Sequence, residues 1–273
     1  MHYEEKKKPI NNLENPLVSI ITPLYNASKF ILQNLKSVQN QTYSNWEHII
    51  IDDASTDASA VIVKEFTKRD PRIRFIQLEK NHGAAFCRNL ATEKAKGTFM
   101  AFLDSDDYWH SEKLQKQINF MLQQDAWVSF THYLHVDEEG KPLGKRILAL
   151  PKLPYKKQLL NNYIGNLTGV YNAEKLGKIV APNIRKRQDW AVWLEAIKRS
   201  ETPALGIQED LAFYRIRKGS ISSNKLKLIK YNYLFYRSLG FNSIKSGGYL
   251  LRFFWEYFIV RPKYIQKLAV ILS

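Results

Sequence analysis

The segment Phe99-Met100-Ala101-Phe102-Leu103-Asp104-Ser105-Asp106-Asp107 sets both the expected fold class and the expected chemistry of the chain. Its five apolar residues predict a buried strand, and three carboxylates follow within four positions. Like charges this close repel one another, so they add no stability to a strand end. They become favourable around a divalent cation, because carboxylate oxygens suit Mg²⁺ or Mn²⁺, which usually also hold substrate phosphates. A solvated acidic turn is the alternative interpretation.

Length and charge narrow the class of protein. The 273 residues suffice for one large domain or a domain with an appendage. Lys and Arg number 41 against 26 Asp and Glu, and this net charge of +15 favours phosphates, nucleic acid or an acidic membrane face as partners. A single cysteine, Cys87, excludes an intrachain disulfide framework and fits a reducing cytosol. Residues 1–9 lack the apolar core of a signal peptide, and no apolar run approaches the ~20 residues of a spanning helix, so we expect a cytoplasmic protein.

Before this segment, short apolar runs alternate with stretches whose apolar residues recur at helical spacing. Strands are expected at residues 17–22, 46–51, 73–78 and 99–103, with helices at 31–38, 58–66, after 83 and at 114–122. The pattern predicts an α/β fold with a mostly parallel central sheet flanked by helices. Ligands of such sheets bind beyond the carboxyl ends of the strands. This places Tyr25, Asp53 and Asp106 on one rim.

The pattern changes after Tyr133. Residues 135–145 predict a hairpin, and a helix is expected to begin at Asp189. Residues 225–273 hold nine Lys and Arg against one Glu, so they supply +8 of the net charge. We therefore divide the chain into a flexible segment 1–15, an α/β domain 16–222 and a basic, aromatic, helical extension 223–273.

The extension has two interpretations. Residues 248–260 are too short and too charged to cross a bilayer. They suit an interfacial helix, with aromatic rings at the lipid boundary and cations over anionic headgroups. The alternative is a helix that packs on the domain and turns a solvated basic face outward.

Four motifs together resemble the inverting family 2 glycosyltransferases with the GT-A fold. They are IITPLYN (20–26), IDDASTD (51–57), NHGAAFCRN (81–89) and LDSDD (103–107). The later segments RQDW (187–190) and YRIRKGSISSNK (214–225) resemble members that build bacterial capsule, teichuronic-type or lipopolysaccharide sugars. The resemblance implies transfer of a sugar, with inversion, from a nucleotide-sugar donor carrying UDP to a hydroxyl of a cell-surface saccharide. Lipid-linked acceptors of this kind would bring the protein to the inner face of the cell membrane.

The resemblance also implies roles for individual residues. Tyr25 packs against the base, Asp53 accepts a hydrogen bond from the uracil imide, and Arg88 faces a base carbonyl or the diphosphate. Asp106 is the expected ligand of Mg²⁺ or Mn²⁺, and Asp104 is expected to contact the ribose or a metal-bound water. The full set of expected nucleotide contacts is Thr22, Pro23, Tyr25, Asp53, Arg88, Asp104 and Ser105. A half-buried packing role for Tyr25 and a surface position for Arg88 are the alternatives.

Inversion needs one general base that deprotonates the acceptor hydroxyl. The family position maps to Asp189, for which a helix N-cap is the alternative role. Many relatives carry a histidine as a further metal ligand where this chain has Arg217. Arginine cannot ligate a cation, so Arg215, Arg217 or Lys218 is a candidate to hold the diphosphate directly.

The remaining polar motifs have structural interpretations. Asp52 and Asp57 are expected in a turn and at a helix start, Cys87 is expected to be a small packing residue, and the histidines are expected to be structural. A non-catalytic module that binds nucleic acid or membrane is the rival function, but RNA-binding aromatic motifs are missing and we expect no nucleic-acid partner. A nucleotidyltransferase would need a glycine-rich, lysine-bearing loop, which residues 23–27 do not offer.

Overall fold

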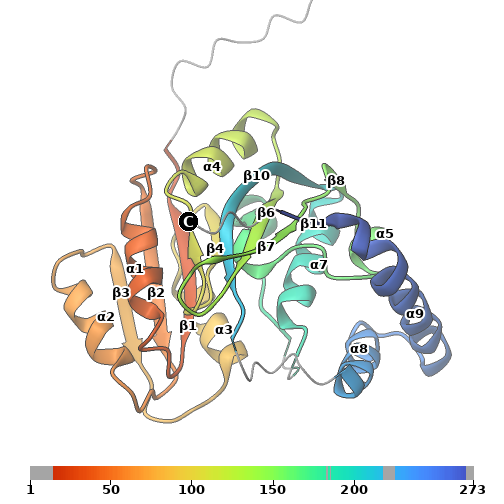
Figure 1. Cartoon of the computed structure of the whole chain (residues 1–273), viewed down its shortest axis with the longest axis horizontal. Helices are drawn as coiled ribbons and strands as arrows, with labels where there is room; N and C mark the ends of the chain where they lie inside the picture. Colours follow the sequence, from red (N-terminus) through yellow and green to blue (C-terminus); the bar gives the residue numbers. More distant parts are fainter. Residues whose placement is uncertain (1–14, 183, 185, 218–224, 269–273) are drawn as a thin grey trace, which may run out of the picture.

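A computed structural model describes residues 15–182, 184, 186–217 and 225–268 (Figure 1). Its first half alternates strands and helices at the places that the sequence predicts. These elements are β1 (Val18–Leu24), α1 (Ile31–Gln39), β2 (Trp46–Asp52), α2 (Ser59–Thr67), β3 (Ile73–Gln77), α3 (Ala84–Lys94) and β4 (Phe99–Phe102). The predicted α/β class, with a central sheet flanked by helices, is confirmed.

The order of the first four strands creates a place for a ligand. They run parallel in the order β3-β2-β1-β4, with Val18 of β1 beside Trp46 of β2 on one side and Phe99 of β4 on the other. The chain therefore moves outward from β1 to β3 and then returns to the opposite side of β1. Ligands of open α/β sheets bind at such a switch point, beyond the carboxyl ends of the strands.

The second half of the chain widens the sheet. It contributes β5 (Tyr108–Trp109), α4 (Lys113–Gln123), β6 (Val128–Val136), β7 (Pro142–Ile147), β8 (Lys152–Leu153), α5 (Tyr155–Gln158), η1 (Asn166–Thr168), β9 (Val170–Asn172), α6 (Ala173–Leu176), α7 (Gln188–Ser200) and β10 (Ala204–Arg215). The expected hairpin forms between β6 and β7. Antiparallel pairs also join β9 to β4 and β6, whereas β10 lies parallel to β6. The β6–β7 hairpin joins antiparallel strands, and the parallel pair of β6 and β10 is connected by a long crossover that includes α7.

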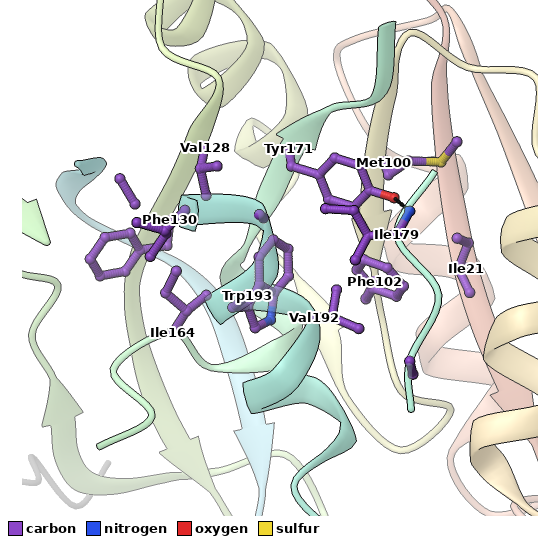
Figure 2. Packing of buried hydrophobic residues seen from close by; sticks show 14 of the residues in the cluster. Ile21, Met100, Phe102, Val128, Phe130, Ile164, Tyr171, Ile179, Val192 and Trp193 are labelled. Atoms are coloured by element: carbon purple, nitrogen blue, oxygen red, sulfur yellow. Dashed lines mark hydrogen bonds between the residues drawn. The ribbon is translucent and has the colours of Figure 1, made fainter. Parts of the chain in front are cut away.

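Two apolar layers sandwich the sheet. Ile20 of β1 faces the layer under α1, α2 and α4, whereas Ile21 faces the layer under α3 and α7, because successive strand residues point to opposite faces. In the second layer, Figure 2 shows Trp193 of α7 against Phe102 of β4, with ring centroids 5.6 Å apart and planes at 87°. Trp193 also covers Gly169, where an added Cβ would lie 2.3 Å from the indole. This close approach fixes α7 against the sheet.

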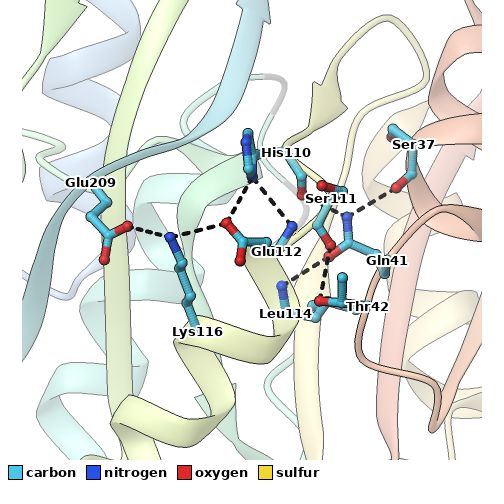
Figure 3. Close-up of polar contacts among 9 residues, drawn as sticks. All are labelled: Ser37, Gln41, Thr42, His110, Ser111, Glu112, Leu114, Lys116 and Glu209. Carbon is cyan, nitrogen blue, oxygen red and sulfur yellow. Dashed lines mark hydrogen bonds and ion pairs between the residues drawn. The ribbon is translucent and has the colours of Figure 1, made fainter.

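The chain after the acidic motif is tied to the end of α1. Gln41 Nε2 donates to the His110 carbonyl at 2.7 Å, and its Oε1 accepts from the Leu114 backbone N–H at 2.9 Å (Figure 3). On the next turn of α4, Lys116 forms ion pairs with Glu112 and Glu209. These contacts hold α4 at the sheet, so the motif between β4 and β5 is anchored at both ends.

The C-terminal residues pack on α7 and on the sheet edge. They form α8 (Lys225–Ser238), α9 (Ser243–Trp255), the π-helical turn η2 (Glu256–Val260), η3 (Arg261–Tyr264) and β11 (Ile265–Lys267). β11 pairs antiparallel with β7 and adds a strand to that edge of the sheet. The predicted division at 222/223 lies outside the described residues, as does nearly all of the segment 1–15. In the described part of the chain, none of the helices is long and apolar enough to span a membrane.

Candidate functional site

A cavity of about 550 Å³ opens at the carboxyl ends of β1, β2 and β4. Tyr25, Asp53 and Asp106 meet on its rim, as the strand pattern predicts. The predicted site residues that line it are Pro23, Tyr25, Asp53, Arg88, Asp104, Ser105 and Asp106. Tyr214 and Arg215 at the end of β10 and Arg217, which follows this strand, also line it.

Asp53 organises one end of the cavity. It follows β2 directly, and its two carboxylate oxygens accept hydrogen bonds from the backbone N–H groups of His82 at 2.7 Å and Gly83 at 2.8 Å. Gly83 has a φ of +89°, which L-amino acids rarely adopt, and it precedes the first residue of α3. A carboxylate has about four acceptor positions, so Asp53 retains acceptor capacity toward the cavity. Tyr25 lines the same end of the cavity with half of its side chain exposed, which fits both stacking on a base and the half-buried packing role.

Thr22 lies beneath the cavity and not on its wall. Its side chain is fully buried, its hydroxyl donates to the Leu103 carbonyl at 2.6 Å, and Oγ1 lies 2.8 Å from His48 Nε2. The pleat of β1 sends this residue into the interior, where it ties β1 to the start of the acidic motif. The structure therefore does not bring Thr22 to the expected nucleotide contacts.

Each carboxylate of the acidic motif has a different partner. Asp104 Oδ1 accepts from Arg88 Nη2 at 2.6 Å, and Asp106 Oδ2 lies 2.8 Å from Arg217 Nε. Asp107 is buried and accepts the backbone N–H of Arg215 at 2.9 Å. Burial raises the pKa of Asp106 and raises that of Asp107 well above its usual value, and the neighbouring carboxylates add to both shifts. The motif is therefore not a freely solvated acidic turn.

The donor set fits a cation that is shared with a phosphate ligand. Among the described residues, no three His, Cys, Asp or Glu side chains come together as a closed metal site. Mg²⁺ is usually held by one or two carboxylates together with substrate phosphates. All three carboxylate residues of the motif line the cavity, but Asp107 is buried and bonded to the Arg215 backbone N–H, whereas the side chains of Asp104 and Asp106 are partly exposed. These two side chains match that sparse ligand set.

Arg215 and Arg217 have different tasks. The Arg215 guanidinium donates to the carbonyls of Asp106 at 2.8 Å, Asp137 at 3.0 Å and Glu138 at 2.6 Å. It is buried and also lines the cavity, and these bonds fasten the acidic motif to the β6–β7 turn, so its donors are already engaged. Arg217 keeps its side chain at the cavity. Lys218 lies outside the described residues.

Arg88 connects the donor side of the cavity to α7. Besides its ion pair with Asp104, it donates through Nη1 to Gln188 Oε1 at 3.1 Å, and its side chain is 15% exposed. A surface position for Arg88 is therefore wrong. The contact reaches the first residue of α7, next to Asp189.

Asp189 does not cap α7. The cap residue is Arg187, which has φ +70° and ψ +20° and makes no side-chain cap hydrogen bond. Arg187 Nε donates to Asn232 of α8 at 2.8 Å, and this tertiary contact supports a backbone conformation that is uncommon outside glycine. Asp189 Oδ2 instead accepts from Asn162 Nδ2 at 2.8 Å. The carboxylate lies in the first helical turn, where the helix dipole favours negative charge.

Several structural expectations are confirmed. Asp57 accepts from the backbone N–H groups of Ser59, at the start of α2, and Ser28. Cys87 is fully buried, and burial raises the pKa of its thiol to about 12, which fits a packing residue. His132 Nδ1 accepts the Ala149 backbone N–H at 2.9 Å, as a structural histidine would.

The model of glycosyl transferase family 2 matches residues 19–178. The chain belongs to this family. It is 46% identical over 224 residues to TuaG of Bacillus subtilis, named as a teichuronic acid biosynthesis glycosyltransferase, covering 82% of this chain and 88% of TuaG. It is 38% identical to WfgD of Escherichia coli, named as a UDP-Glc:alpha-D-GlcNAc-diphosphoundecaprenol beta-1,3-glucosyltransferase, covering 80% of this chain and 84% of WfgD.

A solved structure shares the fold. S. aureus TarS in complex with UDP-GlcNAc superposes with a TM-score of 0.70 at 22% identity, covering 90% of this chain and 74% of that chain. The predicted family and GT-A fold are confirmed, and the protein is a glycosyltransferase. A non-catalytic nucleic-acid or membrane-binding module finds no support in these comparisons.

Proposed function

We propose that the enzyme moves a sugar, with inversion, from a UDP-sugar to a hydroxyl of a lipid-linked saccharide. The observation that carries the proposal is the cavity at the strand switch point, where Asp53, Arg88 and the acidic motif surround one space. TarS was solved in complex with UDP-GlcNAc, and the name of WfgD states UDP-Glc and a diphosphoundecaprenol-linked GlcNAc as its substrates. Teichuronic acid synthesis, stated for TuaG, fits an acceptor that is a growing cell-surface saccharide.

The donor has a matching side chain for each of its parts. The exposed ring of Tyr25 stacks on the uracil, and Asp53 uses its remaining acceptor capacity for the imide N–H. Ser105 and Asp104 hold the ribose. The Arg88 guanidinium approaches the diphosphate from the α3 side, where its planar fork suits phosphate oxygens.

Mg²⁺ or Mn²⁺ is the proposed cofactor. Asp106 would hold it, with Asp104 contributing directly or through a water. When bound beside the diphosphate, such an ion neutralises the charge that grows on the departing UDP. Asp106 follows a buried strand and its neighbour Asp107 is anchored to Arg215, so its backbone is fixed at the cavity wall.

Asp189 is the proposed general base. It takes the proton of the acceptor hydroxyl while the hydroxyl oxygen bonds to the anomeric carbon and the bond from that carbon to the diphosphate breaks. Asn162 orients one carboxylate oxygen by a hydrogen bond at 2.8 Å. The adjacent residue Gln188 contacts Arg88, so the base and the diphosphate side of the cavity are coupled through one short path.

We place the enzyme at the cytoplasmic face of the cell membrane, because α9 and η2 expose an apolar stripe. The stripe consists of Ile244 (88% exposed), Leu251 (72%), Trp255 (64%) and Phe258 (61%), and its spacings of seven, four and three residues keep it on one helical side. The opposite side packs inward, with Phe253 buried against Trp190. The extension therefore packs on the domain, but the side that it turns outward is apolar and not merely a solvated basic face.

Charge complements the stripe. Lys245 and Arg252 of α9 are exposed, as are Lys263 and Lys267 later in the extension. Glu256, the one acidic residue of the sequence from 225 onward, is buried and ion-paired with Lys157. Burial of large apolar side chains contributes about 1.5–3 kcal/mol each, and basic residues near an anionic surface about 1 kcal/mol each. An anionic lipid surface is the partner that satisfies both features.

A donor screen tests the function. The protein is mixed with UDP-, GDP-, dTDP- and CMP-sugars, with and without Mn²⁺, and thermal shifts are recorded. The best donor is then incubated with polyprenyl-diphosphate saccharides, and the transferred sugar and its anomeric configuration are determined. We expect a UDP-sugar to give the largest shift and the product to have inverted configuration. Failure of every nucleoside diphosphate to bind, or a retained configuration, would overturn the proposal.

A further inference from the structure

Arg217 occupies an unusual position in the donor cavity. It follows β10 and reaches back to the acidic motif, where its Nε lies 2.8 Å from Asp106 Oδ2. Its guanidinium carbon also lies 5.6 Å from the centre of the Phe30 ring. The carboxylate that best suits a metal ion is thus paired with a guanidinium from the protein itself.

The exposure of Arg217 allows this pair to open. The Arg217 side chain is 40% exposed, whereas Arg215, two residues earlier, is 3% exposed and holds backbone carbonyls. Rotation of Arg217 leaves in place the bonds that Arg215 makes to the β6–β7 turn. An arriving ligand can recruit this guanidinium at the cost of its ion pair with Asp106 and its contact with the Phe30 ring.

The charges of the cavity show why recruitment is needed. Asp53, Asp104, Asp106 and Asp107 line the space that a diphosphate must enter, and the donors of Arg215, which also lines it, are held by backbone carbonyls and Gln33. Arg88 already forms an ion pair with Asp104, which partly neutralises its charge. A diphosphate competes for Arg217 on favourable terms, because guanidinium forms paired, charge-assisted hydrogen bonds with phosphate oxygens.

We propose that Arg217 is the resident counter-charge of Asp106 and passes from this carboxylate to the donor diphosphate when the donor binds. The inference rests on the proposed UDP-sugar function of the same cavity. Two consequences follow. UDP binds measurably without a divalent cation because Arg217 supplies positive charge, and Asp106 becomes free for the cation as the guanidinium leaves it.

Calorimetric titration of the full chain with UDP and UMP, in EDTA and in Mn²⁺, tests the exchange. For Arg217→Gln in EDTA, we expect UDP affinity to fall roughly 10- to 100-fold and UMP affinity to change much less, because the lost contacts are charge-assisted bonds to the second phosphate. Mn²⁺ should recover most of the loss. For Arg217→His, the imidazole can ligate the ion, so the gain from Mn²⁺ should be larger still.

Arg72 provides a matched control. It is likewise 40% exposed and lies 2.8 Å from its partner Asp70, outside the cavity. Arg72→Gln should leave both nucleotide affinities unchanged. Equal UDP affinity of Arg217→Gln and the unaltered protein in EDTA would overturn the exchange, as would an equal loss for UMP and UDP, which would indicate a general disturbance of the cavity. Failure of the unaltered protein to bind any nucleoside diphosphate would instead overturn the proposed function.

Discussion

Trp190 of α7 and Phe235 of α8 stack with ring centroids 4.1 Å apart and planes inclined by 17°. Both rings are fully buried, and Trp190 directly follows Asp189. Arg187, on the other side of Asp189, donates to Asn232 of the same helix α8. The C-terminal extension thus braces the start of α7 from both flanks of the proposed base.

Phe235→Ala should therefore weaken both the fold and the chemistry. Loss of a buried phenylalanine costs about 3–5 kcal/mol of unfolding free energy, and release of α7 should lower the transfer rate more than UDP affinity. Denaturant unfolding, transfer assays and UDP titration check this. Phe258→Ala, at an exposed position, is the control and should change stability by less than about 0.5 kcal/mol. A stable Phe235→Ala protein with full activity would show that the brace is unnecessary.

Asp189→Asn should separate binding from catalysis. General base catalysis contributes about 10²–10⁴-fold, so we expect transfer to fall by at least about 100-fold while UDP still binds. Single-turnover transfer and calorimetry measure the two effects. Glu174→Gln removes an acid from the first turn of another helix, α6, and should change neither. Retained turnover of Asp189→Asn would remove this residue from the base role.

The exposed stripe predicts binding to anionic vesicles. The full chain should float with vesicles that contain phosphatidylglycerol and remain behind with neutral ones. Leu251→Glu with Phe258→Glu should abolish flotation, since two large apolar side chains contribute about 3–6 kcal/mol at a lipid boundary. Val61→Glu with Val180→Glu adds the same charge at comparably exposed sites elsewhere. An equal loss in both double variants would point to net charge alone.

His48 predicts a pH dependence of stability. Burial lowers the pKa of its imidazole from 6.5 to about 3 in the folded protein. The unfolded chain therefore binds this proton first, and stability falls as the pH drops below about 6.5, by up to ~1.4 kcal/mol per pH unit, until about pH 3. In His48→Gln, the unfolding free energy should fall less steeply with decreasing pH between pH 6.5 and 4, and the difference in slope should be roughly the value above. His110→Gln, at a site where the side chain is only partly buried, should leave it unchanged, and identical slopes in all three proteins would contradict the assignment.

Local sequence predicted the strands, the rim and most of its side chains. Apolar runs such as 99–103 form strands because both faces of the sheet are covered, and polar residues directly after them must lie at the carboxyl edge. Tyr25, Asp53 and Asp106 were therefore predictable from the strand pattern, with the resemblance to the family adding their roles.

Contacts between residues far apart in the sequence could not be predicted from the local sequence pattern. Asp189 suggested an N-cap, but α7 begins one residue earlier because Arg187 is held by Asn232, and nothing nearby in the sequence signals that contact. The Asp106–Arg217 pair joins residues 111 positions apart. Thr22 belongs to a motif whose neighbours reach the cavity, yet the pleat of β1 turns its hydroxyl inward.

The close contact between Gly169 and the indole of Trp193 influences the position of α7 from outside the cavity. Trp193 lies one helical turn beyond Asp189. The size of the side chain at position 169 therefore sets the distance between this turn of α7 and strands β4 and β9. A methyl group there would collide with the indole and shift this turn of α7, and with it Asp189, although residue 169 does not line the cavity. The placement of the proposed base therefore depends on a residue beneath the helix.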